Sequence, residues 1–365
     1  MHADILIIGA GPAGCAAAIH ARQAGLSVMM IEARADACRA PGETLHPGVE
    51  PILKKLGVWH NVIAAGFHRH RGVWRESGGL RVFEPYGSNE GSDAGSDSES
   101  DSGPGSGTGS DSGPDSGSQQ AWLGFQADRR ILHGILQRAA EQAGAVLRRD
   151  AAPGGVIRED GCRGGVGGVV CKGAEIRTRW VFDATGRRAW LARMLALRAE
   201  RPGPPLRVRF GWKNGEDPCL EGQPLFRQQL NGWAWQAPLG DGSTAWAVLD
   251  HASARTAQPG WGEHGGGGGR GVDMTWRLHA PCAGPGYFLL GDAAALLDPA
   301  SSNGVLRALM SGMLAADLAA QVRCGRDEHA ATQAYSSWIS GLFHHQAARL
   351  LESYLPARDT GERAG

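Results

Sequence analysis

Apolar residues along the chain fall into short runs that predict β-strands, and the first run is followed by a turn and a helix. Residues 4–8 form an apolar, β-branched run, the glycine-rich stretch GAGPAG follows at 9–14, and an alanine-rich stretch continues to Gly25. A second apolar run, LSVMMIE, ends at Glu32. This order of strand, glycine turn, helix and strand is typical of a nucleotide-binding βαβ unit.

The pattern of an apolar strand that closes on glycine and an acidic residue occurs twice more. WVFDATGRR closes on Asp183 and Gly186, and GYFLLGDAA closes on Gly291 and Asp292. Because the carboxyl ends of parallel strands meet at one edge of a sheet, these turns are expected to lie beside the first one. We therefore expect both turns to contact the cofactor, through Asp183, Gly186, Gly291 and Asp292.

The three glycines of the first turn suit different parts of a pyrophosphate site. Gly9 allows a tight turn, Gly11 lets the backbone approach the phosphates, and Gly14 permits close packing of helix and strand. Glu32 follows at about the spacing at which a carboxylate binds ribose hydroxyls. The cluster predicts a bound dinucleotide and leaves NAD and FAD open.

Asp292 favours FAD. An acid far along the chain from the first motif suits a ribityl hydroxyl, and the helix expected from about residue 300 directs its positive dipole at an electron-rich flavin ring. The alternative is that Asp292 and Asp298 are turn formers that bond their own backbone. Three strand-and-glycine turns in this order indicate one extended dinucleotide.

The motifs GAGPAG, DATG and GDAAALLDPASSNG, in this order, resemble the FAD-binding signature of the aromatic hydroxylase fold. Group A flavin monooxygenases share this fold with flavin-dependent tryptophan halogenases and geranylgeranyl reductase-like proteins. The resemblance implies that the glycine turn holds the pyrophosphate and that Glu32 binds the adenosine ribose. It also implies that Asp292 binds the ribityl chain and that three residues lie along the isoalloxazine: Pro299, Ser302 and Gly304. The stretch DRRILHGIL makes Arg129 a flavin or phosphate contact, with an ordinary arginine at a helix start as the alternative.

The resemblance implies an α/β fold with a Rossmann-like FAD-binding domain, an interleaved, mostly antiparallel β substrate domain and C-terminal helices. We expect the FAD-binding domain in 1–66, 126–200 and 281–323, the substrate domain in 67–125 and 201–280, and the helical region in 324–365. Within these, helical patterns run over 300–323 and 327–355.

Pairs of aromatic and imidazole side chains are the candidate pocket residues. Trp233 and Trp235 are two apart in a predicted strand and therefore face the same side, where they line a pocket wall or pack in the core. His68 and His70 are also two apart and face one side of a predicted strand. They could donate a proton to the substrate or bind it by hydrogen bonds, and the alternative is that both are ordinary surface histidines. No third ligand accompanies this pair, so no metal site is predicted.

Glu43, in the sequence PGET, resembles a Gly-Glu turn that lies beside the flavin in the halogenase-like branch, although helix capping explains it as well. With His68, His70 and Ser302 it completes the set of candidate catalytic residues. The resemblance also implies a lysine that relays hypohalous acid in halogenases, and the corresponding stretch FHRHRGVWRE contains none.

The resemblance therefore favours an FAD-dependent monooxygenase that hydroxylates an indole or phenol through a flavin C4a-hydroperoxide, with NAD(P)H as a transient reductant and molecular oxygen as co-substrate. Four alternatives remain open: a halogenase-like enzyme, a flavoprotein that modifies tryptophan within a peptide, a reductase of an isoprenoid double bond, and a non-catalytic FAD-binding scaffold. The substrate is thus a small aromatic molecule or a tryptophan-containing peptide, and no nucleic acid partner is expected.

One segment differs from the rest of the chain in composition. Residues 87–120 contain seven acidic residues, no lysine or arginine, and no large apolar side chain, which predicts a disordered loop or an acidic partner-binding segment.

The seven cysteines are scattered without a CxxC pair, which fits a reduced compartment. We find neither a charged leader nor an apolar run of roughly 20 residues, so we expect a cytoplasmic protein without a membrane span.

Overall fold

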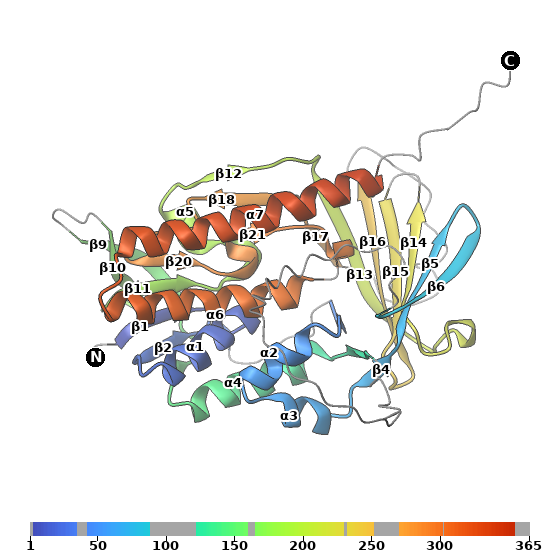
Figure 1. Ribbon diagram of the computed structural model, residues 1–365, viewed down its shortest axis with the longest axis horizontal. Helices are drawn as coiled ribbons and strands as arrows, with labels where there is room; N and C mark the ends of the chain where they lie inside the picture. Colours follow the sequence, from blue (N-terminus) through green and yellow to red (C-terminus); the bar gives the residue numbers. More distant parts are fainter. Residues whose placement is uncertain are drawn as a thin grey trace, which may run out of the picture.

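The structure is a computed structural model that describes residues 3–34, 42–87, 122–159, 165–229, 232–251, 270–301 and 303–354. It has a Rossmann-like half and a large antiparallel sheet that stand side by side (Figure 1). All of the predicted acidic loop except Gly87 lies outside the described residues, and so does Ser302.

An eight-stranded sheet forms the core of the first half. Five of its strands run parallel in the order β20-β11-β1-β2-β8, while β19, β10 and β9 pair antiparallel at its edges. The bounds are β1 (Ala3–Ile8), β2 (Val28–Ile31), β8 (Val146–Arg148), β9 (Pro153–Arg158), β10 (Val166–Cys171), β11 (Ala174–Asp183), β19 (Ala283–Gly284) and β20 (Tyr287–Leu289). Both faces of the central strands are covered, so residues 5–8 of β1 are all buried.

Helices cover this sheet, and the last helix extends from it toward the seven-stranded sheet of the second half. Helix α1 (Pro12–Gln23) packs against α6 (Gly304–Arg323) and α4 (Arg129–Gln142), and α7 (Glu328–Tyr354) packs on α6 and spans both halves (Figure 1). Gly312 permits the close approach of α1 and α6, because a Cβ at that position would lie 2.2 Å from the backbone oxygen of Ala13.

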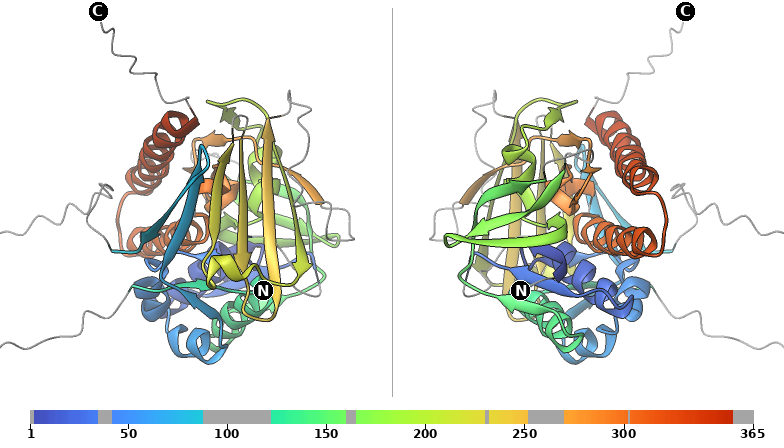
Figure 2. Two further views of the ribbon diagram at one scale, coloured as in Figure 1. Left: turned by 90° about the vertical axis from the view of Figure 1, so that its right-hand side faces the viewer. Right: turned by 90° about the vertical axis from the view of Figure 1, so that its left-hand side faces the viewer.

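A seven-stranded sheet forms the second half, in the order β17-β13-β16-β15-β14-β5-β6. All neighbours are antiparallel except β14 and β5. The bounds are β5 (Gly72–Ser77), β6 (Leu80–Pro85), β13 (Leu206–Asn214), β14 (Leu225–Gln229), β15 (Gly232–Pro238), β16 (Ser243–His251) and β17 (Arg270–Asp273). In the left view of Figure 2 this sheet faces the viewer, in front of the Rossmann-like half.

Two small sheets and several short helices connect the halves. One sheet contains β3 (Thr44–Leu45), β7 (Gly124–Gln126) and β4 (His68–His70), and the other contains β12 (Arg198–Glu200), β18 (Arg277–Ala280) and β21 (Ala295–Leu296). The short helices are α2 (Val49–Lys55), α3 (Trp59–Ala64) and α5 (Trp190–Met194), with 3-10 turns η1 (Gly186–Arg188), η2 (Pro218–Leu220), η3 (Gly291–Ala293) and η4 (Pro299–Ser301).

The predicted fold class is confirmed: a parallel Rossmann-like sheet, a mostly antiparallel sheet and C-terminal helices are all present. The two long helical patterns correspond to α6 and α7. The details differ at β4 and β7, which we expected in the substrate sheet and which instead pair with each other and with β3.

By length and composition, α6 is the one helix among the described residues that could cross a membrane, whereas the sequence analysis expected no such segment. Half of its apolar window is buried inside the molecule, where it packs on α1. A core helix shows the same composition, so this feature is weak evidence for a membrane span.

Candidate functional site

A cavity of about 680 Å³ joins the two halves of the molecule. At one end it is lined by residues that follow the carboxyl ends of β1, β2, β11 and β20, where open α/β sheets bind their ligands. At the other end it is lined by aromatic and small apolar residues of the seven-stranded sheet. The nucleotide motifs and the tryptophan pair therefore face one space.

Two of the three glycines in the glycine turn are required by close backbone packing, and the third borders the cavity. Gly9 has φ +102°, and a Cβ there would lie 2.4 Å from the Ala184 oxygen, while one at Gly14 would lie 2.1 Å from the Gly9 oxygen. A Cβ at Gly11 would meet nothing within 4 Å. Gly11 thus borders open space at the start of α1, whose first turn has no acidic residue and no side-chain cap. This is the geometry of an anion cradle at a helix N-terminus.

Glu32 lies at the end of β2 and lines the cavity, and its contact with a ribose stays a prediction. Its carboxylate also stabilises the turn, because one oxygen accepts a hydrogen bond from the Ala10 amide at 2.8 Å and the other from the Arg34 amide at 3.1 Å. The same side chain thus ties the glycine turn to β2 and faces the predicted ribose position.

Asp183 differs from its predicted cofactor role. It is fully buried and is not among the residues that line the cavity. Its two oxygens accept hydrogen bonds from the backbone amides of Thr185, at 2.9 Å, and Leu191, at 2.7 Å. The carboxylate is turned inward by these bonds, so it shapes the turn that brings Gly186 to the cavity wall.

Gly291 also differs from its predicted contact role, whereas Asp292 beside it lines the cavity. A Cβ at Gly291 would lie 3.3 Å from the Ala308 side chain, and its amide donates to Ser311 at 2.9 Å, so this glycine serves the packing of α6. The cavity wall continues beyond Asp292 through Pro299 and Gly304, whose contact with an isoalloxazine stays a prediction.

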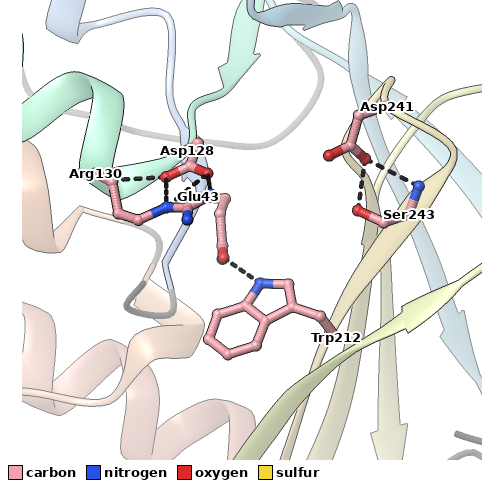
Figure 3. A network of polar contacts seen from close by, with 6 residues as sticks. All are labelled: Glu43, Asp128, Arg130, Trp212, Asp241 and Ser243. Atoms are coloured by element: carbon pink, nitrogen blue, oxygen red, sulfur yellow. Dashed lines mark hydrogen bonds and ion pairs between the residues drawn. The ribbon is translucent and has the colours of Figure 1, made fainter. Parts of the chain in front are cut away.

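Charged groups of both signs surround the middle of the cavity. Burial raises the pKa of Asp292 above its ordinary value, while Arg307, Arg187 and Arg129 act in the opposite direction. Burial likewise lowers the pKa of Arg129, against the attraction of Glu43 and Asp292. The neighbouring Arg130 is instead exposed and paired with Asp128 at 2.7 Å, as Figure 3 shows.

Four buried nitrogen atoms on the cavity wall have no hydrogen-bond partner among the described residues: Nε and Nη1 of Arg129, Nε2 of His133 and Nε of Arg307. Buried polar atoms are almost always satisfied in folded proteins, so such a set indicates a polar ligand. Burial lowers the pKa of His133 to about 3, so its imidazole is neutral near neutral pH.

These observations fit FAD. A cradle without side chains at Gly11 suits the pyrophosphate, a carboxylate at Glu32 suits the ribose, and unsatisfied donors at Arg129 and Arg307 suit phosphate or flavin oxygens. His133 and Arg307 were missed by the sequence analysis. The signal for His133 is its position one helical turn after Arg129 in α4, on the same face.

The wall of the seven-stranded sheet is aromatic. Trp233 and Trp235 both line the cavity, as their spacing predicts, and they are joined by Phe226 and Trp212. Phe226 lies directly opposite Trp235 in the β14–β15 pairing. Trp212 comes from β13, so period-two alternation within β15 could not identify it.

Two tryptophans of this sheet donate hydrogen bonds from their indole nitrogens to carboxylates that lie outside the sheet. Trp212 Nε1 donates to Glu43 Oε1 at 2.7 Å, a bond drawn as a dashed line in Figure 3, and Trp233 Nε1 donates to Asp298 Oδ1 at 3.0 Å. Both carboxylates are buried, and both residues line the cavity. Glu43 therefore lies in the site, as predicted, with a wall residue as its partner.

His68 and His70 lie away from the cavity, so their predicted catalytic role finds no geometric support. Neither is among the lining residues. His68 Nε2 lies 2.7 Å from the Gly222 oxygen, and His70 is fully buried with Nδ1 3.3 Å from the Gly72 oxygen. The reason is that β4 pairs with β7 and not with the large sheet. In the part of the chain that the structure describes, no group of three or more His, Cys, Asp or Glu side chains could hold a metal.

Three comparisons relate the chain to known proteins. A family model described as "FAD binding domain" matches residues 2–212. The chain is 24% identical to a 1H-pyrrole-2-carbonyl-(peptidyl-carrier protein) brominase of Pseudoalteromonas luteoviolacea, over 93% of this chain and 82% of that protein. It is 29% identical to a menaquinone reductase of Mycobacterium tuberculosis, over 87% of this chain and 76% of that protein.

Among solved structures, a flavin-dependent brominase superposes with a TM-score of 0.77 and 24% identity, covering 96% of this chain and 87% of the other. Two monooxygenases match over only 20% and 21% of the chain. The monooxygenase expectation is therefore supported less well than the halogenase-like and reductase alternatives.

Proposed function

The chain belongs to the family of FAD-binding domain proteins, and from this premise we propose that it is an FAD-dependent oxidoreductase of the halogenase-like branch that oxidises an aromatic substrate with molecular oxygen. One observation carries the proposal. A single cavity connects the glycine turn and its unsatisfied donors with an aromatic wall. A ring held at that wall lies beside the cofactor.

The described residues would divide the work as follows. Gly11 and the N-terminus of α1 would hold the pyrophosphate, Glu32 would hold the ribose, and three further residues of the cavity wall would contact the rest of the cofactor: Arg129, Asp292 and Arg307. Bound FAD supplies the redox chemistry, including the activation of oxygen once a nicotinamide or a separate reductase has reduced it. The sheet excludes water and orients the substrate.

We expect oxygen rather than halogen to be transferred. The four lysines of the chain are Lys54, Lys55, Lys172 and Lys213, and none of them lines the cavity. The lysine relay that the resemblance to halogenases implies is therefore missing from the described site. In this proposal the protein is related to halogenases but transfers oxygen, and not halogen, to its substrate.

Reduction of a double bond is the second candidate. It is favoured by the similarity to a menaquinone reductase over most of both chains and by the apolar character of the sheet wall. A quinone or an isoprenoid chain would bury its carbon atoms there as well as an indole would.

Mass spectrometry of one reaction separates these candidates. FAD-loaded protein is incubated with NADH or NADPH, bromide, isotopically labelled oxygen and a panel that contains indole, phenol, a tryptophan-containing peptide and menaquinone. One labelled oxygen atom in an aromatic product supports the proposal. Bromination, gain of two hydrogen atoms without oxygen, or the absence of any product would overturn it in favour of the halogenase, the reductase or the scaffold, respectively.

A further inference from the structure

The inner face of the seven-stranded sheet has a trough along β16. Trp212 of β13 lies opposite Ala245, and Trp235 of β15 lies opposite Ala247. All four residues line the cavity. Two alanines thus form the floor, and the two indoles stand diagonally across it, Trp212 beside Ala245 and Trp235 beside Ala247.

The two walls are offset along the trough and do not face each other directly. They stand on strands two apart, about 9.5 Å between backbones, and they are two residues apart along β16, which adds roughly 7 Å along the strands. A ring over the alanines can therefore stack on one indole at a time, with its carbon atoms about 3.5 Å from that wall. A flat ring brings all of its carbon atoms into such contact, whereas a puckered ring does not.

The wall formed by Trp212 is held in place by a hydrogen bond to a residue outside the sheet. Trp212 is half-buried, and its indole nitrogen donates to Glu43 across the cavity at 2.7 Å (Figure 3). The backbone of Glu43 is itself fixed, since its oxygen accepts from the Ala127 amide at 2.8 Å. The indole is therefore held at both ends, by β13 and by Glu43.

We propose that Trp212, held by Glu43, is the wall that sets substrate selectivity, and that the trough over Ala245 and Ala247 admits flat rings in preference to puckered ones. This inference rests on the proposed function, because it assumes that the aromatic cavity takes the substrate. Trp212 and Glu43 act here as positioning residues, and the selectivity follows from the planarity of the ligand, which decides how much of it stacks on the indole.

The test compares two ligands that differ in planarity and not in size. Phenol and cyclohexanol have the same number of heavy atoms, and only phenol is planar. FAD-loaded protein is titrated with each by calorimetry, without reductant, and visible absorption confirms equal FAD content in every variant. We expect the wild type to prefer phenol by roughly three- to tenfold, the range for one aromatic pair.

Four variants separate the wall from general stability. Trp212→Ala and Glu43→Ala should bring the ratio of the two affinities close to one, whereas Glu43→Gln keeps an acceptor for the indole and should keep the wild-type ratio. Ala247→Leu fills the trough and should weaken both ligands. Trp122→Ala, at an exposed tryptophan outside the cavity, is the control.

The outcomes distinguish this inference from the function on which it rests. If Trp212→Ala and Glu43→Ala retain the wild-type ratio, the selectivity wall is refuted while aromatic binding stands. If the wild type binds neither ring, the proposed aromatic substrate fails, and the inference fails with it. A purely structural role for Trp212 would lower both affinities equally and would leave their ratio unchanged.

Discussion

Replacing Gly11 by alanine separates the folding role of the glycine turn from its proposed cofactor role. The new methyl group would meet no atom within 4 Å, and the residue has an ordinary negative φ of −79°. The cost to folding is that of alanine at a helix N-cap, about 1 kcal/mol. Gly14→Ala, in the same motif, would instead place a methyl group 2.1 Å from the Gly9 oxygen. Such overpacking costs about 1–3 kcal/mol or more.

For FAD affinity the order of the two variants should be reversed, with the larger loss in Gly11→Ala. The Gly11 methyl group occupies the space where a phosphate approaches the first amides of α1, so at least one charge-assisted hydrogen bond is lost. Such a bond contributes about 1.5–3 kcal/mol, which corresponds to a loss of FAD affinity of roughly ten- to a hundredfold. Gly341→Ala, at an exposed position of α7 with no atom within 4 Å, adds the same group far from the cavity.

Two assays on the apo-proteins are sufficient. FAD is titrated while flavin fluorescence is followed, and thermal unfolding is followed by circular dichroism. We expect Gly11→Ala to unfold near the wild-type temperature and to bind FAD weakly, and Gly341→Ala to match the wild type in FAD affinity. Wild-type FAD affinity in Gly11→Ala would refute the assignment of this turn as the pyrophosphate cradle.

Three further predictions follow from single residues. Asp183→Ala leaves two buried backbone amides without acceptors, so urea unfolding should show a loss of about 2–4 kcal/mol; a neutral result would contradict its role in the turn. Asp292→Asn should lower the FAD content after gel filtration, and it should preserve or raise apo-protein stability at neutral pH, because burial raises the pKa of Asp292 and thus disfavours its ionised form in the folded state. Burial lowers the pKa of His70 to about 4 and of His133 to about 3, so the unfolded chain binds more protons in acid. The free energy of unfolding should therefore fall as the pH drops below about 6.5. His70→Gln should flatten part of this slope without changing turnover, and a large loss of turnover would restore His70 as a catalytic residue.

Local patterns were sufficient for the parts of the site that are contiguous in the chain. The glycine turn depends on neighbouring residues, and the shared face of Trp233 and Trp235 depends only on strand alternation. Both are found where the sequence places them. Asp183 and Gly291 also lie in the predicted turns, but their roles depend on partners that the pattern does not reveal. The Asp183 carboxylate accepts from the Leu191 amide, and the Gly291 amide donates to the Ser311 hydroxyl.

Contacts between distant segments could not be predicted. The Glu43–Trp212 bond joins residues 169 positions apart, and Arg307 reaches the cavity only because α6 packs against α1. The placement of His68 and His70 failed for a related reason. Their three-residue strand has the same alternation whichever sheet it joins, and it pairs with β7.

The central claim is that one cavity holds FAD and an aromatic substrate side by side. The most direct test is to add indole to FAD-loaded protein, without reductant, and to record the visible absorption of the flavin. We predict a saturable shift of the flavin bands that disappears in Ala247→Leu although that variant still retains FAD. Binding of indole by calorimetry without any change in the flavin spectrum would contradict the account, because the ring would then lie outside the cofactor cavity.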